Sequence, residues 1–116
     1  MAVKVVIWHN PRCSKSRATL GLLKERGIEP EVRLYLEDAP SEAELRGALE
    51  ALGIGPGDLV RRGEAAFREA GLSKTSRDDE VLAAMVAVPK LIERPVVFAN
   101  GKAAIGRPPE AVLRIL

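Results

Sequence analysis

The sequence VKVVIWHNPRCSKSRATLGLLKERG, residues 3–27, joins a short apolar run to a helical pattern through a polar turn. Residues 3–8 are β-branched or aromatic apart from Lys4, a composition typical of a buried parallel strand. The HNP tripeptide breaks this run. Residues 14–26 then carry good helix formers and leucines at helical spacing, and Gly27 favours a left-handed helix end. The stretch therefore predicts a strand followed directly by a helix.

A second apolar run follows at residues 32–36, shortly after Pro30. It has the length and the composition of a strand. Strand, helix and strand in this order predict a βαβ unit, in which the two strands are parallel and the crossover is right-handed.

The middle of the chain, about residues 41–88, reads as a helical insertion. Ser41 and Glu44 have the spacing of a capping box, and the apolar residues that follow keep helical spacing up to Gly53. Residues 55–58, with the sequence GPGD, predict a turn.

Two more helices are expected before the insertion ends. Residues 64–70 predict a short helix, and Ser76 with Asp79 predicts a second capping box. The helix after that box stops at Pro89. Its expected core-facing residues are Val81, Ala84, Met85 and Val88.

The last third of the chain changes period. Residues 96–99 and 102–105 flank Asn100-Gly101, which is the strongest short-range signal for a β-hairpin with a two-residue turn. A terminal helix follows Pro108-Pro109, with core-facing residues expected at Val112, Leu113 and Leu116. The whole pattern predicts an α/β fold, in which one mixed four-stranded sheet (β-α-β, helical insertion, β-β-α) has helices on its faces.

Length and composition predict one domain over residues 1–116. The chain is 47% hydrophobic and 29% charged, which is enough for a modest core. Its 18 Lys and Arg residues against 16 Asp and Glu residues leave a net charge of +2, and only four side chains are aromatic. We therefore expect no nucleic acid as a partner, because such binding needs a basic surface and stacking platforms.

No apolar run approaches the roughly 20 residues of a membrane span, and the first residues do not resemble a cleavable signal. We therefore expect no membrane association. The single cysteine excludes an internal disulfide and by itself cannot hold a structural zinc, so no metal is expected. These features favour a monomer in the reducing cytoplasm.

Cys13 is the strongest candidate for chemistry. It stands at the predicted strand–helix junction, where the helix N-terminus carries partial positive charge and favours a thiolate over a thiol. Arg12, Lys15 and Arg17 add cations close by in the sequence. The alternative is a buried structural cysteine, but polar neighbours on both sides favour a nucleophile.

The same loop is a candidate oxyanion site, because backbone N–H groups at a helix start bind phosphate-like anions. Arg61, Arg94 and Arg107 lie at turns or strand ends where a planar guanidinium can join such a site. Taken singly, each is ordinarily a solvated surface charge. Pro95 stands at a strand start, and base rates alone favour a trans bond before it.

In order and spacing these residues are similar to the glutaredoxin-coupled arsenate reductases, the ArsC/Spx-like family with a thioredoxin-like fold. The similarity covers nearly the whole chain. The residues that carry it are His9-Asn10-Pro11-x-Cys13-x-x-Ser16-Arg17, Tyr35-Leu36-Glu37, Leu59-Val60-Arg61-Arg62, Arg94-Pro95 and Arg107-Pro108.

The resemblance implies a catalytic role for Cys13, which would attack arsenate or a related oxyanion. It also implies glutathione as co-substrate, glutaredoxin as electron donor, and no tightly bound cofactor. The implied supporting residues are Arg61, Arg94 and Arg107 for oxyanion binding, His9 and Ser16 for stabilising the thiolate, and Asn10, Pro11 and a cis Pro95 for the structure of the site.

The sequence is also compatible with two other functions. One is a glutathione-dependent thiol/disulfide reductase, and the other is a non-catalytic Spx-like regulator that binds RNA polymerase. The Spx-like proteins usually carry Cys-x-x-Cys, whereas Ser16 stands at the second position here. A chain with one cysteine cannot resolve its own oxidised intermediate, so any redox cycle requires an external thiol.

Overall fold

The computed structural model describes residues 4–116, so the predicted first residue of the opening strand, Val3, lies outside the described part. The chain divides into two compact units. The first combines the chain up to Asp38 with Arg94–Leu116, and the second is Ala39–Glu93. The helical insertion expected at about 41–88 falls within the second unit, and one domain over 1–116 stays a prediction.

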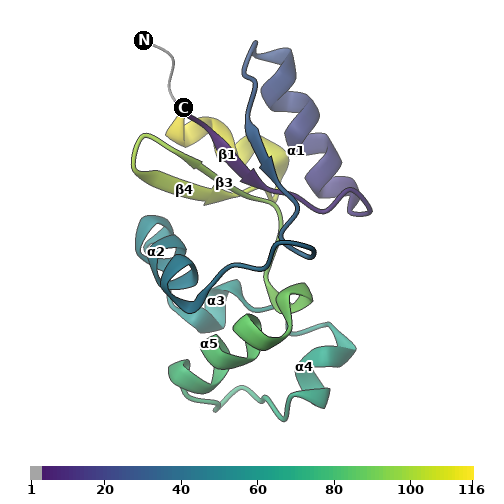
Figure 1. The fold of residues 1–116 in the computed structure, drawn as a ribbon, viewed down its shortest axis with the longest axis vertical. Helices are drawn as coiled ribbons and strands as arrows, with labels where there is room; N and C mark the ends of the chain where they lie inside the picture. Colours follow the sequence, from purple (N-terminus) through teal and green to yellow (C-terminus); the bar gives the residue numbers. More distant parts are fainter. Residues whose placement is uncertain (1–3) are drawn as a thin grey trace. The chain divides into compact units, whose positions relative to one another are not determined.

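The first unit contains a mixed four-stranded sheet in the order β2-β1-β3-β4 (Figure 1). β1 pairs in parallel with β2, with Ile7 opposite Val32, and antiparallel with β3, with Ile7 opposite Val97. β3 and β4 form the antiparallel hairpin. This topology confirms the predicted fold class. The element bounds are β1 (Val6–Trp8), α1 (Ser14–Glu25), β2 (Glu31–Arg33), β3 (Val96–Ala99), β4 (Lys102–Ile105) and the 3-10 helix η2 (Pro109–Ile115).

The core of this unit lies between the sheet and the pair α1 and η2, which pack against each other. Both ends of the chain contribute to it, so the sheet unites segments that are distant in sequence. Its buried members are Val5, Ile7, Leu23, Val97, Ala99, Val112 and Ile115.

The second strand is shorter than predicted. β2 ends at Arg33, and the expected strand residues 34–36 form a turn instead. The N–H groups of Glu37 and Asp38 both donate to the carbonyl of Leu34, which closes that turn. As a result Tyr35 is fully buried and Leu36 is exposed.

The hairpin turn is as predicted. Asn100 and Gly101 have φ angles of 55° and 73°, the left-handed pair that a type I′ turn requires. The Asn100 side chain also donates from Nδ2 to the carbonyl of Ile115 at 2.8 Å, which ties the turn to the end of η2.

The terminal helix differs from the prediction in its period. Because η2 is a 3-10 helix with about three residues per turn, Val112 and Ile115 share its buried face. Leu116, expected in the core, is 42% exposed, and Leu113 is partly exposed.

The second unit consists of helices, namely α2 (Glu42–Leu52), α3 (Pro56–Leu59), α4 (Ala65–Glu69), α5 (Asp78–Ala87) and the 3-10 helix η1 (Pro89–Leu91). The first capping box is confirmed, since Ser41 and Glu44 exchange both of its hydrogen bonds. α2 ends at left-handed Gly53, as predicted. The predicted turn at 55–58 is for the most part a single helical turn, α3.

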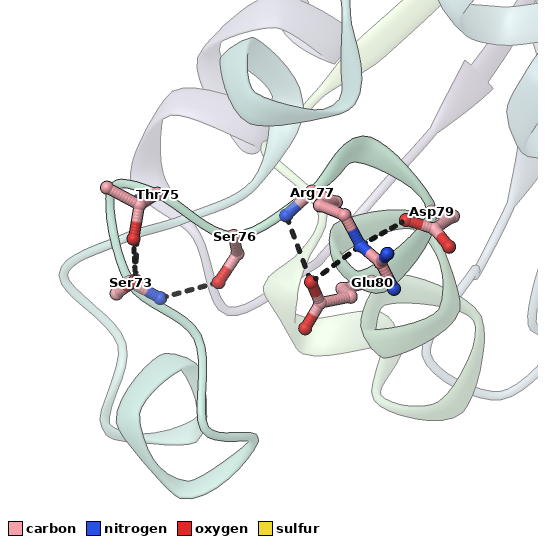
Figure 2. A network of polar contacts seen from close by, with 6 residues as sticks. All are labelled: Ser73, Thr75, Ser76, Arg77, Asp79 and Glu80. Atoms are coloured by element: carbon pink, nitrogen blue, oxygen red, sulfur yellow. Dashed lines mark hydrogen bonds and ion pairs between the residues drawn. The ribbon is translucent and has the colours of Figure 1, made fainter.

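The second capping box lies one residue later than predicted, at Arg77 and Glu80. Ser76 Oγ accepts from the N–H of Ser73 at 2.8 Å and so closes the preceding turn (Figure 2). Glu80 instead accepts from the N–H of Arg77 at 3.2 Å, and Arg77 becomes the N-cap. Leu82 joins Val81 and Met85 as the buried residues of α5, in place of Ala84 and Val88, which are partly exposed.

Within residues 4–116, no helix combines the length and the apolar character that crossing a bilayer requires.

The 3-10 register of η2 predicts unequal costs at adjacent positions. Ile115→Ala removes a side chain that is 8% exposed and should lower the free energy of unfolding by about 2–5 kcal/mol. Leu116→Ala, the matched control, should change it by no more than about 0.5 kcal/mol. Urea denaturation of both variants checks this. Equal losses at the two positions would contradict the 3-10 register.

Candidate functional site

Cys13 occupies the N-cap position of α1, directly after the loop that follows β1. Its backbone is extended, with φ −95° and ψ 123°, and its N–H donates to the carbonyl of Asn10 at 3.0 Å. Its side chain makes no capping hydrogen bond. The sulfur is therefore left at the positive end of a 12-residue helix, on a partly exposed residue.

The loop before Cys13 is held by its own polar groups. Asn10 is 8% exposed, and its Oδ1 accepts from the N–H of Arg12 at 3.0 Å. The carbonyl of Pro11 accepts from Arg17 Nη1 at 2.9 Å, which links the loop to the first turn of α1. These bonds account for the shape that the chain takes at Asn10 and Pro11.

Arg107 approaches the sulfur from the other end of the chain. Its Nη2 donates to Cys13 Sγ at 3.8 Å, although the two residues are 94 positions apart. Its Nε donates to the carbonyl of Arg94 at 2.9 Å. The backbone of Arg94 therefore orients the guanidinium that faces the sulfur. The bonds Arg94-Pro95 and Arg107-Pro108 are both cis.

Gly106 and Thr19 form a contact that sequence reasoning did not single out. The N–H of Gly106 donates to the carbonyl of Pro95 at 2.9 Å. A Cβ atom at Gly106 would overlap Thr19 Oγ1 and lie 2.7 Å from Pro95 Cγ. Only glycine lets the segment before Arg107 pack this closely against α1. An isolated glycine at a strand end was the available signal, since it often marks a close approach of backbone.

His9 and Ser16 are both buried and bound to each other. His9 Nδ1 lies 2.6 Å from Ser16 Oγ, and Ser16 Oγ also accepts from the N–H of Asn10 at 3.0 Å. Burial lowers the pKa of His9 below its ordinary 6.5, and the positive charges of Arg17 and Lys24 lower it further. The ring is then neutral at pH 7, and His9 Nδ1 and Ser16 Oγ share one hydrogen bond.

The family resemblance implies that His9 and Ser16 stabilise the Cys13 thiolate, and this role stays a prediction. In the described part of the chain, their side-chain hydrogen bonds connect them to each other and to Asn10. The hydrogen bond to Sγ within that part comes from Arg107.

Arg61 lies in the second unit, between α3 and α4. Its Nη1 is 2.6 Å from Glu64 Oε1, and its Nε is 3.5 Å from Glu93 Oε1. Two carboxylates therefore already balance its charge. Of the three arginines expected to bind an oxyanion, Arg94 and Arg107 belong to the same unit as Cys13.

The arrangement around Cys13 suits nucleophilic attack on an anion. Backbone N–H groups at the start of α1 and the Arg107 guanidinium both favour negative charge next to the sulfur. A thiolate and an oxyanion repel each other, so bringing them together requires such cations.

A scan against family models matches residues 8–115 to the ArsC family. Among named proteins, the chain is 55% identical over 118 residues to the uncharacterized protein YfgD of Escherichia coli K12, covering 100% of this chain and 99% of that protein. It is 45% identical over 115 residues to the arsenate reductase of Neisseria meningitidis serogroup A, covering 97% and 98%.

Solved structures agree with this similarity. The arsenate reductase from Vibrio cholerae superposes with a TM-score of 0.95 at 49% identity over the full length of both chains. The putative arsenate reductase from Yersinia pestis superposes with a TM-score of 0.91 at 49% identity, covering 97% of this chain and 100% of that one.

The lowered pKa of His9 predicts how stability depends on pH. As the pH drops below 6.5, His9 becomes protonated in the unfolded chain while it stays neutral in the folded chain. The unfolded state then binds more protons, so the free energy of unfolding should fall as the pH drops below 6.5. His9 is the only histidine, so His9→Asn should remove this component. Denaturation at a series of pH values above the range in which Asp and Glu titrate measures this pH dependence. A slope that is unchanged in His9→Asn would contradict the assignment.

Proposed function

The chain belongs to the ArsC family, and from this premise we propose that it is a thiol-dependent oxidoreductase that reduces arsenate to arsenite through Cys13. The observation that carries the proposal is the contact of Arg107 Nη2 with Cys13 Sγ at 3.8 Å. It sets a planar guanidinium cation beside the one cysteine of the chain, at a helix N-terminus.

In the first step the Cys13 thiolate attacks arsenic, an arsenic–sulfur bond forms, and one arsenate oxygen leaves as water after taking up protons. Arg107 interacts with both the thiolate and the incoming oxyanion, which lowers the repulsion between two anions. The N–H groups at the start of α1 offer further donors to the arsenate oxygens.

The second step needs an external thiol, because the chain has no second cysteine. We assign this role to glutathione, whose thiolate attacks the enzyme-bound intermediate. The glutathione sulfur bonds to Cys13 Sγ, the bond from Sγ to arsenic breaks, and its electron pair stays on arsenic, which leaves as arsenite. The two thiol sulfurs together lose two electrons and form a mixed disulfide. Glutaredoxin then reduces the mixed disulfide. Such chemistry fits the reducing cytoplasm, where glutathione is available.

The remaining residues support this site in the proposal. The Arg94 side chain binds the oxyanion, while its carbonyl orients Arg107. His9, Ser16 and Asn10 maintain the loop from which Cys13 points. Arg61 belongs to the second unit, where its guanidinium is paired with Glu64 and Glu93, and its role in oxyanion binding stays a prediction from the sequence.

A coupled assay with NADPH, glutathione, glutaredoxin and arsenate tests the proposal. Cys13→Ser should abolish arsenate-dependent NADPH oxidation. Arg107→Ala should lower kcat/KM for arsenate at least about tenfold, since a charge-assisted hydrogen bond contributes about 1.5–3 kcal/mol. Arg94→Ala keeps the carbonyl that orients Arg107, so any rise in its KM for arsenate reports on the Arg94 side chain alone.

Arg26→Ala is the matched control. This exposed arginine lies at the opposite end of α1 from Cys13, and its substitution should leave kcat/KM unchanged. Arsenate reduction by Cys13→Ser at the wild-type rate would refute the mechanism. Reduction of a glutathione mixed disulfide without any reduction of arsenate would instead identify a thiol/disulfide reductase.

A further inference from the structure

A pocket of about 300 Å³ lies beside the loop that carries Cys13. It is lined by residues 9–12 of this loop and by Leu34, Leu36 and Glu37 from the turn after β2. All of these residues belong to the first unit. We propose that this pocket binds the small thiol that reacts at Cys13, and that Arg12 and Glu37 select a zwitterionic thiol peptide of the glutathione type. This inference rests on the proposed function.

The two charged side chains are available for a ligand. Arg12 and Glu37 are both exposed, and within residues 4–116 neither side chain forms an ion pair or a hydrogen bond. Arg12 contributes only its backbone N–H, to Asn10 Oδ1. Because Arg12 and Glu37 line one pocket and carry opposite charges, they match a ligand that carries a carboxylate and an ammonium group at separate ends.

Apolar surface lies between these charges. Leu36 is 44% exposed, one of the few large hydrophobic side chains with so much surface in the described chain. Leu34 is partly exposed, and Pro11 is exposed. The methylene groups and amide faces of a short peptide can cover this surface, while polar groups at its ends fix its orientation.

The pocket lies next to Cys13, the residue at which we propose that the reaction takes place. Arg12 lines the pocket, and the next residue is Cys13. A thiol peptide held there lies against the loop that presents Sγ. The pocket therefore provides binding energy for the second substrate beside the site at which the first one reacts.

The pocket can be tested without arsenate. Cys13 is the only cysteine, so 2,2′-dithiodipyridine labels the protein once, as a neutral mixed disulfide. A thiolate then attacks Sγ, the bond from Sγ to the pyridyl sulfur breaks, a new disulfide to Sγ forms, and thiopyridone leaves with a proton. The exchange involves no net oxidation, and the absorbance of thiopyridone reports its rate.

The wild-type rate should saturate with increasing glutathione, as expected when a complex forms before exchange. Arg12→Ala and Glu37→Gln should each raise the half-saturating glutathione concentration about three- to fivefold, the effect of an exposed charge pair. With 2-mercaptoethanol, which lacks both charged groups, the rate should rise linearly and should be the same in all variants. Arg26→Ala and Glu29→Gln are the matched controls.

A linear dependence on glutathione in the wild type would overturn the proposal. So would equal losses with glutathione and 2-mercaptoethanol in Arg12→Ala, because Arg12 would then act on the sulfur and not on the ligand. Neither result depends on arsenate reduction. A protein that saturates with glutathione but leaves arsenate unchanged would refute the proposed function and keep the pocket.

Discussion

The contact between Arg107 and Cys13 is the constraint on which the site depends, because it joins residues 94 positions apart. It requires α1 to start at Cys13 and the hairpin to deliver Arg107 to the same place. The carbonyl of Arg94 orients the guanidinium, and the bare backbone of Gly106 allows close packing against Thr19. These contacts of the first unit together bring the Arg107 guanidinium to Cys13 Sγ.

A small buried polar network supports the same loop. His9, Ser16 and Asn10 lie in the interior, where an unmade hydrogen bond costs about 1–3 kcal/mol. The three residues are hydrogen-bonded to one another. Because burial keeps the His9 ring neutral, this network fixes the shape of the loop and adds no positive charge to it. These hydrogen bonds hold the loop that ends at Cys13.

Local signals in the sequence predicted the local structure well. Asn100-Gly101 specified the hairpin turn, and Ser41 with Glu44 specified the first helix cap. The predictions failed where the same residues can form two alternative local structures. Ser76 closes a turn instead of capping a helix, and η2 follows a 3-10 period that buries Ile115 and exposes Leu116. Periodicity alone does not distinguish three residues per turn from 3.6.

The candidate site was only partly predictable from the sequence. Cys13 follows from its place at a helix start, whereas Gly106 matters through contacts made in three dimensions, which no local pattern encodes.

The most direct test of the account is whether an oxyanion binds against Cys13 through Arg107. The measurement is the rate at which iodoacetamide, a neutral reagent, alkylates Cys13 in the presence of increasing arsenate without any reductant. We expect arsenate to slow alkylation of the wild type in a saturable manner, and Arg107→Ala to lose most of this protection. Alkylation that is indifferent to arsenate, or that is slowed equally in both proteins, would contradict the account.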